Sequence, residues 1–382
     1  MFLIIATLLL LEARLGSAAV EVVVAAAAPA VDWIGRWLPL FYVPSLVTLP
    51  LALTSLPPAL LAKVSLLLAL GWLTSLLFAA AVTVRIRAAT KVELLPVPPA
   101  PKAAPFTAAQ SLGWASLGGA SAAWLLVDPS SQLALHAFLL AATICGFLAG
   151  TALPPKVQKV MHPLFACALV ANAAAAAAGQ VTGLGHFGAL AAYLTKGSTS
   201  FLGAGDWLMA FLHSVILSFG FRVFSQRQLM RRHFAEIMGC VLATALFSMA
   251  LSAAAGAALG LPQTVSMALA PRSVTVALAL PIAALLGAQA LASLTAVSVM
   301  LTGLLGANFA QPVLTAFGYT DPVVRGLATA ASAHGLGTAA LAAKEPEALP
   351  MAALAYATMG VVSSLLVALP QVRGALLALA AM

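Results

Sequence analysis

The chain has 382 residues, of which 63% are hydrophobic and 7% are charged, and its mean hydropathy is +1.06. A soluble globule cannot hide so much apolar surface from water, so the composition predicts a polytopic membrane protein. The net charge of +8 does not indicate a nucleic-acid partner, because the basic residues lie in short connections between apolar runs. In that position they set the orientation of the spans in the membrane.

The apolar runs fall into two groups along the chain. Three runs before residue 85 predict a small N-terminal membrane module over residues 1–84. Residues 85–105 combine Arg85, Arg87, Lys91 and Lys102 with a series of prolines, which predicts an extended linker. Residues 106–382 hold the remaining runs and are predicted to form the main membrane domain.

Roughly ten to twelve segments have the ~20 apolar residues that a span requires. They must be helices, because an open sheet would leave backbone groups unpaired in lipid and the runs lack the alternation of barrel strands. The predicted fold class is therefore all-α. Met209-Ala-Phe-Leu-His-Ser-Val is echoed by Met267-Ala-Leu-Ala-Pro-Arg-Ser-Val, which predicts internal, inverted repeats with discontinuous helices in the C-terminal module.

The segment Pro271-Arg272-Ser273-Val274-Thr275 lies in the middle of an apolar run, where a proline breaks a helix. The break would leave amides of Ser273, Val274 and Thr275 without helical acceptors, and a helix start of this kind favours an anion. Arg272 adds a planar fork that matches a carboxylate. The sequence thus predicts a site for a small organic acid at Arg272, Ser273 and Thr275.

A purely structural role for Arg272 stays open, in which it snorkels or pairs with Asp321 or Glu236. Asp321 and Arg325 are themselves four residues apart, which predicts a local ion pair. In the first repeat, Ser214 occupies the equivalent start of a half-helix, so it is predicted to face the same carboxylate. His213, just before it, is the weaker candidate.

A second polar stretch contains His334, Gly335, Gly337 and Thr338 within an apolar run. Glycines let backbone approach a ligand closely, and histidine titrates near neutral pH, so this stretch is predicted to bind substrate, with His334 as the proton-coupling candidate. Asn308 is predicted to line the same cavity. The alternatives are a neutral hydrogen-bonded histidine and a packing seam of small residues.

No chemistry other than transport is indicated. Cys145, Cys167 and Cys240 lie in apolar runs without metal-ligand spacing, so neither a metal nor another cofactor is expected. Catalytic motifs of hydrolases, metalloproteases and nucleotide-binding enzymes are not found, and the protein is not expected to be an enzyme. The first residues, 1–11, lack a basic region, so no signal or transit peptide is evident.

Several long motifs resemble a known family. They are Arg36-Trp-Leu-Pro-Leu-Phe-Tyr-Val-Pro-Ser45, Gly205-Asp-Trp-Leu-Met209, Pro271-Arg-Ser-Val-Thr-Val-Ala-Leu-Ala-Leu280 and Ser332-Ala-His-Gly-Leu-Gly-Thr-Ala-Ala340. The chain resembles the LrgA/LrgB (CidA/CidB) membrane proteins in their fused form, the plastidal glycolate/glycerate translocators of plants and algae. Residues 1–84 would be the LrgA-like part and residues 106–382 the LrgB-like part.

The resemblance implies a carrier in the chloroplast inner envelope that exports glycolate and imports glycerate in photorespiration. Its partners would be these two solutes, membrane lipids and a second copy of the chain in a homo-oligomer. Bacterial relatives imply two alternatives, a pyruvate-type monocarboxylate transporter and a holin-like or regulatory membrane protein.

Overall fold

The computed structural model describes residues 2–41, 43–54, 57–93, 106–158, 161, 163–195 and 201–382. All regular structure in these ranges is helical, and no strand occurs among them, which confirms the predicted all-α class. Eight of the helices are long and apolar enough to cross a membrane. The chain is therefore a multi-pass membrane protein.

Fewer helices meet the length and hydropathy of a span than the ten to twelve predicted. The eight are Ser17–Leu51, Pro58–Thr90, Gln132–Ala152, Pro163–Thr182, Ala204–Ser225, Phe234–Ala258, Gln289–Ala316 and Leu349–Ala368. Two helices of span length, α6 (Ala108–Val127) and α18 (Pro322–Lys344), are outside this set. Glycine and serine residues lower the hydropathy of α6, and glycine, serine and threonine residues together with Arg325 and His334 lower that of α18. The predicted run after Val265 is divided into two short helices.

The helices group into two compact units. Unit 1 comprises Met1–Asp32, Leu56–Ala100 and Ile216–Met382, and unit 2 comprises Trp33–Ser55 and Pro101–Val215. Each unit combines residues from both sides of the predicted linker, and the predicted division at residues 85–105 stays a prediction. Residues 85–90 of that segment are helical, since they form the last part of α5, which ends at Thr90. The series of prolines begins later in the sequence. Residues 94–105 lie outside the described residues.

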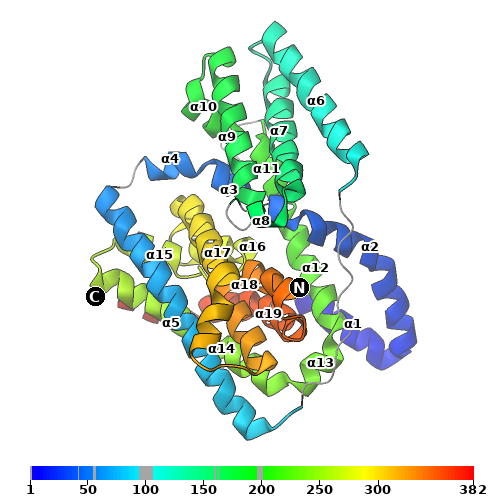
Figure 1. Cartoon of the computed structure of the whole chain (residues 1–382), viewed down its shortest axis with the longest axis vertical. Helices are drawn as coiled ribbons and strands as arrows, with labels where there is room; N and C mark the ends of the chain where they lie inside the picture. The colour runs from blue at the N-terminus through cyan, green and yellow to red at the C-terminus, as the bar shows by residue number, and fades with distance from the viewer. Residues whose placement is uncertain are drawn as a thin grey trace. The chain divides into compact units, whose positions relative to one another are not determined.

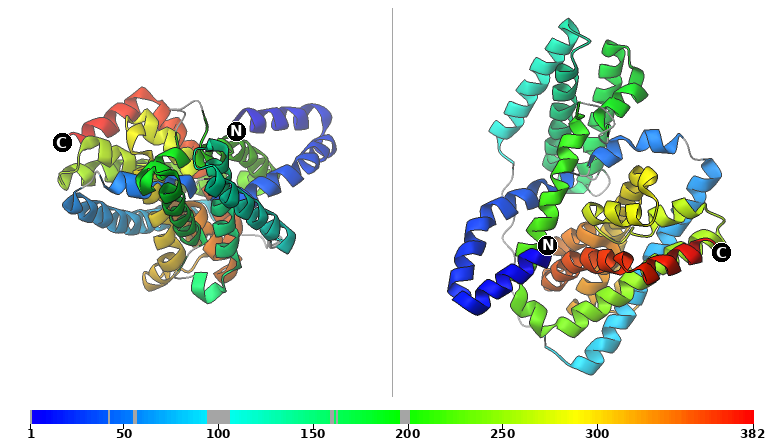
Figure 2. Two further views of the ribbon diagram at one scale, coloured as in Figure 1. Left: turned by 90° about the horizontal axis from the view of Figure 1, so that it is seen from above. Right: turned by 180° about the vertical axis from the view of Figure 1, so that it is seen from behind.

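Unit 1 contains most of the long helices. Its helices are α1 (Phe2–Leu15), the first part of α2 (Ser17–Phe41), α5 (Pro58–Thr90), most of α12 (Leu212–Ser225), α13 (Arg227–Arg232), α14 (Phe234–Ala258), α15 (Gln263–Leu269), α16 (Val276–Leu285), a short 3-10 helix (Gln289–Leu291), α17 (Ala292–Ala316), α18 (Pro322–Lys344), α19 (Leu349–Ala368) and α20 (Pro370–Ala380). Figure 1 and Figure 2 show α18 and α19 side by side.

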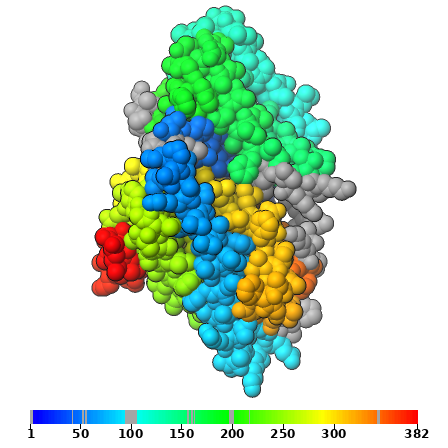
Figure 3. Space-filling model, turned by 60° about the vertical axis from the view of Figure 1, so that its left-hand side comes forward, coloured from blue at the N-terminus to red at the C-terminus, as the bar shows by residue number. Residues whose placement is uncertain are grey.

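Helix α5 runs through the centre of unit 1. Figure 3 shows it between α14 on one side and α17 on the other. Phe78 of α5 stacks on Phe247 of α14 with ring centroids 4.0 Å apart. Gly239 of α14 admits the Ile86 side chain, since a Cβ there would lie 2.5 Å from Ile86 Cδ1. Small residues let membrane helices approach closely, so these contacts fix the position of α5.

Unit 2 holds the shorter helices around α7 and α9. Its helices are α3 (Val43–Val47), α4 (Leu49–Leu53), α6 (Ala108–Val127), α7 (Gln132–Ala152), α8 (Pro155–Gln158), α9 (Pro163–Thr182), α10 (Gly185–Tyr193) and α11 (Ala204–Ala210). Buried polar groups join them: Thr143 Oγ1 hydrogen-bonds Tyr193 Oη at 3.2 Å, and Asn172 donates to the carbonyl of Val47 at 3.0 Å. In lipid such bonds hold helices together where apolar packing alone gives little preference.

Gly326 gives a test of the close packing in unit 1. A Cβ at this position on α18 would lie 2.3 Å from the carbonyl oxygen of Ala348, at the start of α19, so Gly326→Ala should lower the free energy of unfolding by roughly 1–3 kcal/mol. Gly119→Ala is the matched control, because Gly119 is also helical and has no neighbour within 4 Å; it should be neutral or stabilising by up to ~1 kcal/mol. Thermal unfolding of the purified protein in detergent measures both. Equal melting temperatures for the two variants would contradict the packing described.

Candidate functional site

The predicted break at Pro271 is present. Helix α15 ends at Leu269 and α16 begins at Val276, with Thr275 as its N-cap in an extended conformation. The amide of Val274 donates to the carbonyl of Pro271 at 2.9 Å, so it is not free as predicted. Among the described residues, the amide of Ser273 and the first amides of α16 have no backbone acceptor. These amides give the break its positive end.

Arg272 is fully buried in this break, and every partner of its side chain is neutral. Nε donates to Ser252 Oγ at 3.1 Å, and Nη2 donates to the carbonyl of Gly71 at 2.8 Å and to Ser75 Oγ at 3.1 Å. Nη1 makes a single long bond, 3.4 Å to Ser273 Oγ. A guanidinium has five N–H donors, so one N–H of Nη1 has no acceptor among the described residues.

The side chains that hold Arg272 come from two helices distant in sequence. Gly71 and Ser75 lie on α5, and Ser248 and Ser252 lie on α14; Ser248 Oγ hydrogen-bonds Ser273 Oγ at 2.9 Å. Gly71 is required sterically, because a Cβ there would lie 2.9 Å from Nη2. The sequence prediction missed all four residues. The sequence carries one indication of them: on each of the two apolar helices, two small residues lie four positions apart. That spacing puts the two residues on the same face of the helix.

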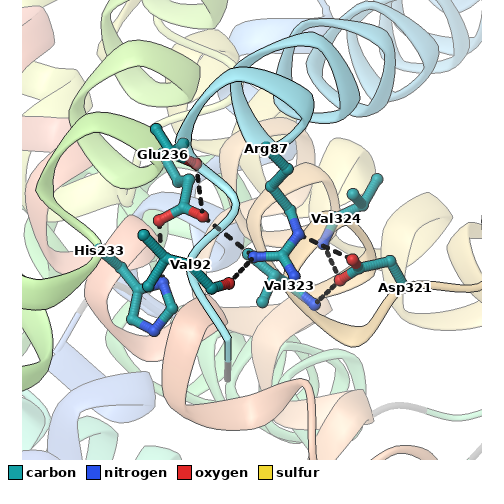
Figure 4. Close-up of polar contacts among 8 residues, drawn as sticks. Arg87, Val92, His233, Glu236, Asp321, Val323 and Val324 are labelled. Atoms are coloured by element: carbon teal, nitrogen blue, oxygen red, sulfur yellow. Dashed lines mark hydrogen bonds and ion pairs between the residues drawn. The ribbon is translucent and has the colours of Figure 1, made fainter. Parts of the chain in front are cut away.

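The acids that could have neutralised Arg272 are paired with other arginines (Figure 4). Arg87 donates to Glu236 at 3.0 Å and to Asp321 at 2.7 Å. Arg325 pairs with Glu345, so the predicted local pair of Asp321 and Arg325 is wrong. Asp321 instead caps α18, accepting from the amide of Val323. The alternative that Arg272 pairs with Asp321 or Glu236 is therefore not what the structure shows.

A buried cation without a counter-charge is costly, and removing charge from water costs several kcal/mol per ion even after relaxation. The described residues supply hydrogen bonds to Arg272 but no negative charge. An anion bound at Nη1 would supply it, and the amides at the start of α16 add a second attraction for the same anion. The arrangement is therefore a candidate for an anion site, and binding of an anion there stays a prediction.

A second break interrupts α18 at Ala333 and His334. His334 has φ +44° and ψ −143°, a conformation that costs energy for any residue with a side chain and that persists only when its surroundings enforce it. Its Nε2 lies 2.8 Å from the carbonyl oxygen of Val299, and its own carbonyl accepts from Thr338 Oγ1 at 2.9 Å. Gly303 of α17 gives the imidazole its space, since a Cβ there would lie 2.6 Å from the ring.

Two aromatic residues connect the breaks. Tyr356 of α19 lies against Gly335, and its hydroxyl group interacts with Thr275 at the start of α16. Trp72 follows Gly71 on α5, and its Nε1 is near Gly306, which in turn packs against Ala333. Sequence reasoning missed both aromatics, which look like ordinary apolar residues of a span.

The described part of unit 1 also leaves polar atoms unpaired near the second break. Trp72 Nε1, Thr302 Oγ1 and Thr329 Oγ1 are buried and have no hydrogen-bond partner among the described residues. Buried polar groups are normally satisfied, so unpaired groups that gather in one region indicate a missing partner. Together with Arg272, these atoms of α5, α17 and α18 are the candidate lining of a proposed solute pocket.

The remaining predicted residues are not brought into this pocket by the described contacts. Asn308 is exposed, donates to the carbonyl of Leu304 on its own helix, and lines a shallow depression between α5 and α17. Ser214 is half-buried in the first turn of α12 and belongs to unit 2. Gly337 lies against Thr329 and Ala333 on α18 itself. The ligand-binding roles of all the predicted site residues stay predictions.

The described residues contain no group of three or more histidine, cysteine, aspartate or glutamate side chains that could hold a metal ion.

Comparisons with known proteins identify the family of the chain. Residues 143–371 match the LrgB-like family. The plastidal glycolate/glycerate translocator 1 of Arabidopsis thaliana is 46% identical over 355 residues, covering 92% of this chain and 69% of the relative. No solved structure matches. On both the family match and this identity, the chain belongs to the LrgB-like family.

Proposed function

We propose that the protein is a carrier of small hydroxy-monocarboxylates that exports glycolate and imports glycerate across the chloroplast inner envelope. Its similarity to a plastidal glycolate/glycerate translocator supports the solutes and the plastid. The observation that carries the proposal is Arg272, a buried cation without an acid beside the start of a half-helix. Such a site requires an anion small enough to enter an apolar bundle.

Arg272 Nη1 is the proposed contact for the carboxylate. Nε and Nη2 are held by Ser252, Ser75 and Gly71, which fix the plane of the guanidinium and leave Nη1 facing Ser273. One carboxylate oxygen would accept from Nη1, and the other would accept from the Ser273 hydroxyl or an amide at the start of α16. Thr275, the N-cap of α16, completes this proposed set of contacts within unit 1. The predicted role of Ser214, which lies in unit 2, stays a prediction.

The other end of the solute would lie toward the break in α18. Glycolate and glycerate each carry a hydroxyl next to the carboxylate, and a hydroxyl needs both a donor and an acceptor. Trp72 Nε1 is an unused donor, and the Thr302 and Thr329 hydroxyls are unused partners of either kind. His334, Gly335, Gly337 and Thr338 form the proposed wall, with Asn308 at its outer end.

Transport follows if the breaks open in turn to the two sides of the membrane. A discontinuous helix allows half of a span to move without unwinding the other half, and binding near the break is shared by many secondary carriers. The solute neutralises Arg272 in the closed state. In the empty carrier the charge of Arg272 is uncompensated, so a change of access from one side of the membrane to the other is disfavoured without a bound solute. This predicts exchange of one solute for another rather than one-way transport.

Arg272→Ala should abolish exchange while leaving the protein folded, because it removes a charge that no acid in the described structure neutralises. The measurement is counterflow of labelled glycolate into proteoliposomes loaded with glycerate, pyruvate or buffer. Arg373→Ala, on the half-buried face of α20, is the control and should exchange like the wild type. Stimulation by pyruvate alone would identify a pyruvate-type transporter, and solute-independent leak would favour a holin-like protein.

Trp72→Phe keeps the ring and removes one buried N–H that has no protein acceptor. We expect weaker glycolate and glycerate affinity, by ~1 kcal/mol or about fivefold in Kd, with no loss of thermal stability. Trp124→Phe, at an exposed tryptophan on α6, is the matched control and should change neither quantity. Unchanged affinity in Trp72→Phe would remove this residue from the site.

His334→Gln tests the predicted proton-coupling role of His334. Glutamine can still donate a hydrogen bond to the carbonyl of Val299 but does not titrate. If His334 carries the coupled proton, exchange by the variant will no longer depend on pH between about 5 and 8. A pH profile parallel to that of the wild type would show that His334 acts as a neutral hydrogen-bond donor.

A further inference from the structure

A second buried polar cluster joins three helices of unit 1 at their ends (Figure 4). His233 and Glu236 are fully buried, and His233 Nδ1 lies 2.8 Å from Glu236 Oε2. The other oxygen of Glu236 accepts from Arg87 Nη1 at 3.0 Å and from Thr90 Oγ1 at 3.2 Å. Arg87 Nε reaches across to Asp321 at 2.7 Å. Arg87 of α5 thus ties the start of α14 to the start of α18.

The cluster is one positive charge short. It contains two carboxylates, Glu236 and Asp321, and one permanent cation, Arg87. His233 is the titratable group in contact with Glu236, and its Nε2 has no partner among the described residues. A proton on His233 would balance the cluster and would give Glu236 a second cationic partner.

We propose that His233 and Glu236 form a second proton site, separate from the coupling role predicted for His334. A proton there would release the contacts of Arg87 with Glu236 and Asp321, which we call the latch. With His233 neutral, Arg87 is the sole cation on the buried Glu236, so separating them would leave a buried carboxylate uncompensated. With His233 protonated, Glu236 keeps a cation when Arg87 leaves. A proton on His233 therefore lowers the cost of separating Arg87 from Glu236, so the protonated form favours opening of the latch. This inference rests on the carrier function proposed above.

The latch acts on the helices that hold Arg272. On α5, Gly71 and Arg87 are 16 residues apart, which is ~24 Å along the helix; on α14, Glu236 and Ser252 have the same separation. Helix α18 carries Asp321 at its start and the break at His334 further along. When Arg87 releases α14 and α18, these helices are free to separate at one end, which opens a path toward the pocket.

Other charged groups near the cluster do not take over these roles. Arg231 and Arg232, just before His233, are exposed, as are Arg85 on α5 and Lys91, the residue that follows α5. Arg325, one turn after Asp321 on α18, is committed to Glu345. Among the described residues, the charged or titratable side chains in direct contact with Glu236 are Arg87 and His233. The protonation state of His233 therefore decides the charge balance of the cluster.

The test is the accessibility of a reporter cysteine one turn inside the latch. In the full chain with Cys145, Cys167 and Cys240 replaced by alanine, Thr83→Cys places a thiol at a buried position on α5, four residues before Arg87. A membrane-impermeant maleimide is applied to each face of proteoliposomes in turn. We expect labelling from one face to rise at least about fivefold between about pH 8 and about pH 5.5.

Three further variants distinguish release of Arg87 from a general loosening of the helix packing in unit 1. His233→Gln keeps a hydrogen bond to Glu236 and should hold labelling at the slow rate at every pH. Asp321→Asn keeps the cap of α18 but removes one attachment of Arg87, and it should raise labelling at high pH. Arg227→Gln breaks the ion pair with Glu12, outside the cluster, and should leave the profile unchanged.

Labelling of Thr83→Cys that is independent of pH, or a pH profile that His233→Gln does not flatten, would overturn the proposal. No solute is present, so the assay reports the latch alone. Failure of the carrier function would instead show as absent counterflow in a protein whose labelling profile is intact.

Discussion

The central constraint on this protein is the burial of Arg272. The charge lies in the middle of a helix bundle that is apolar enough to cross a membrane, and among the described residues no acid accompanies it. Serine hydroxyls and one carbonyl replace part of its hydration, and they fix the plane of the guanidinium. What they cannot supply is negative charge. In the proposed mechanism a small carboxylate would supply that charge, and the energetic cost of the empty site would become affinity for the solute.

The local structure around Arg272 follows from this requirement. Pro271 ends a helix, and the following half-helix begins at Val276 with its first amides unpaired. Gly71 lets the guanidinium reach the α5 backbone. The strained backbone of His334 in α18 and the small Gly306 beside Ala333 bring a second break near the first through Trp72 and Tyr356. Two interrupted helices with shared neighbours are the basis of the proposed pocket, whose access would change as the breaks open in turn.

The features that can be predicted from the sequence alone are the membrane helices and the places where a residue is unsuited to the middle of a helix or a membrane span. Helices are expected because of hydropathy, and the break at Pro271 is expected because proline and arginine are both unsuited to the middle of a span. The break at His334 carries no such mark, since histidine rarely adopts a positive φ. The partners of Arg272 lie about 200 residues earlier or on another helix, and a serine on an apolar helix more often bonds its own backbone, as Thr83 does. Likewise, Asp321 and Arg325 have the spacing of an ion pair, yet Arg87 and Glu345 offer these side chains better-placed partners.

The most direct measurement of the central claim is the melting temperature of purified wild type and Arg272→Ala, each with and without glycolate or glycerate. A ligand that binds the folded state raises its stability by mass action. If Arg272 is a buried charge that the solute neutralises, the variant without solute will melt at or above the wild-type temperature, and only the wild type will gain stability from solute. Unfolding of the variant, or a ligand-induced shift equal to that of the wild type, would contradict the account.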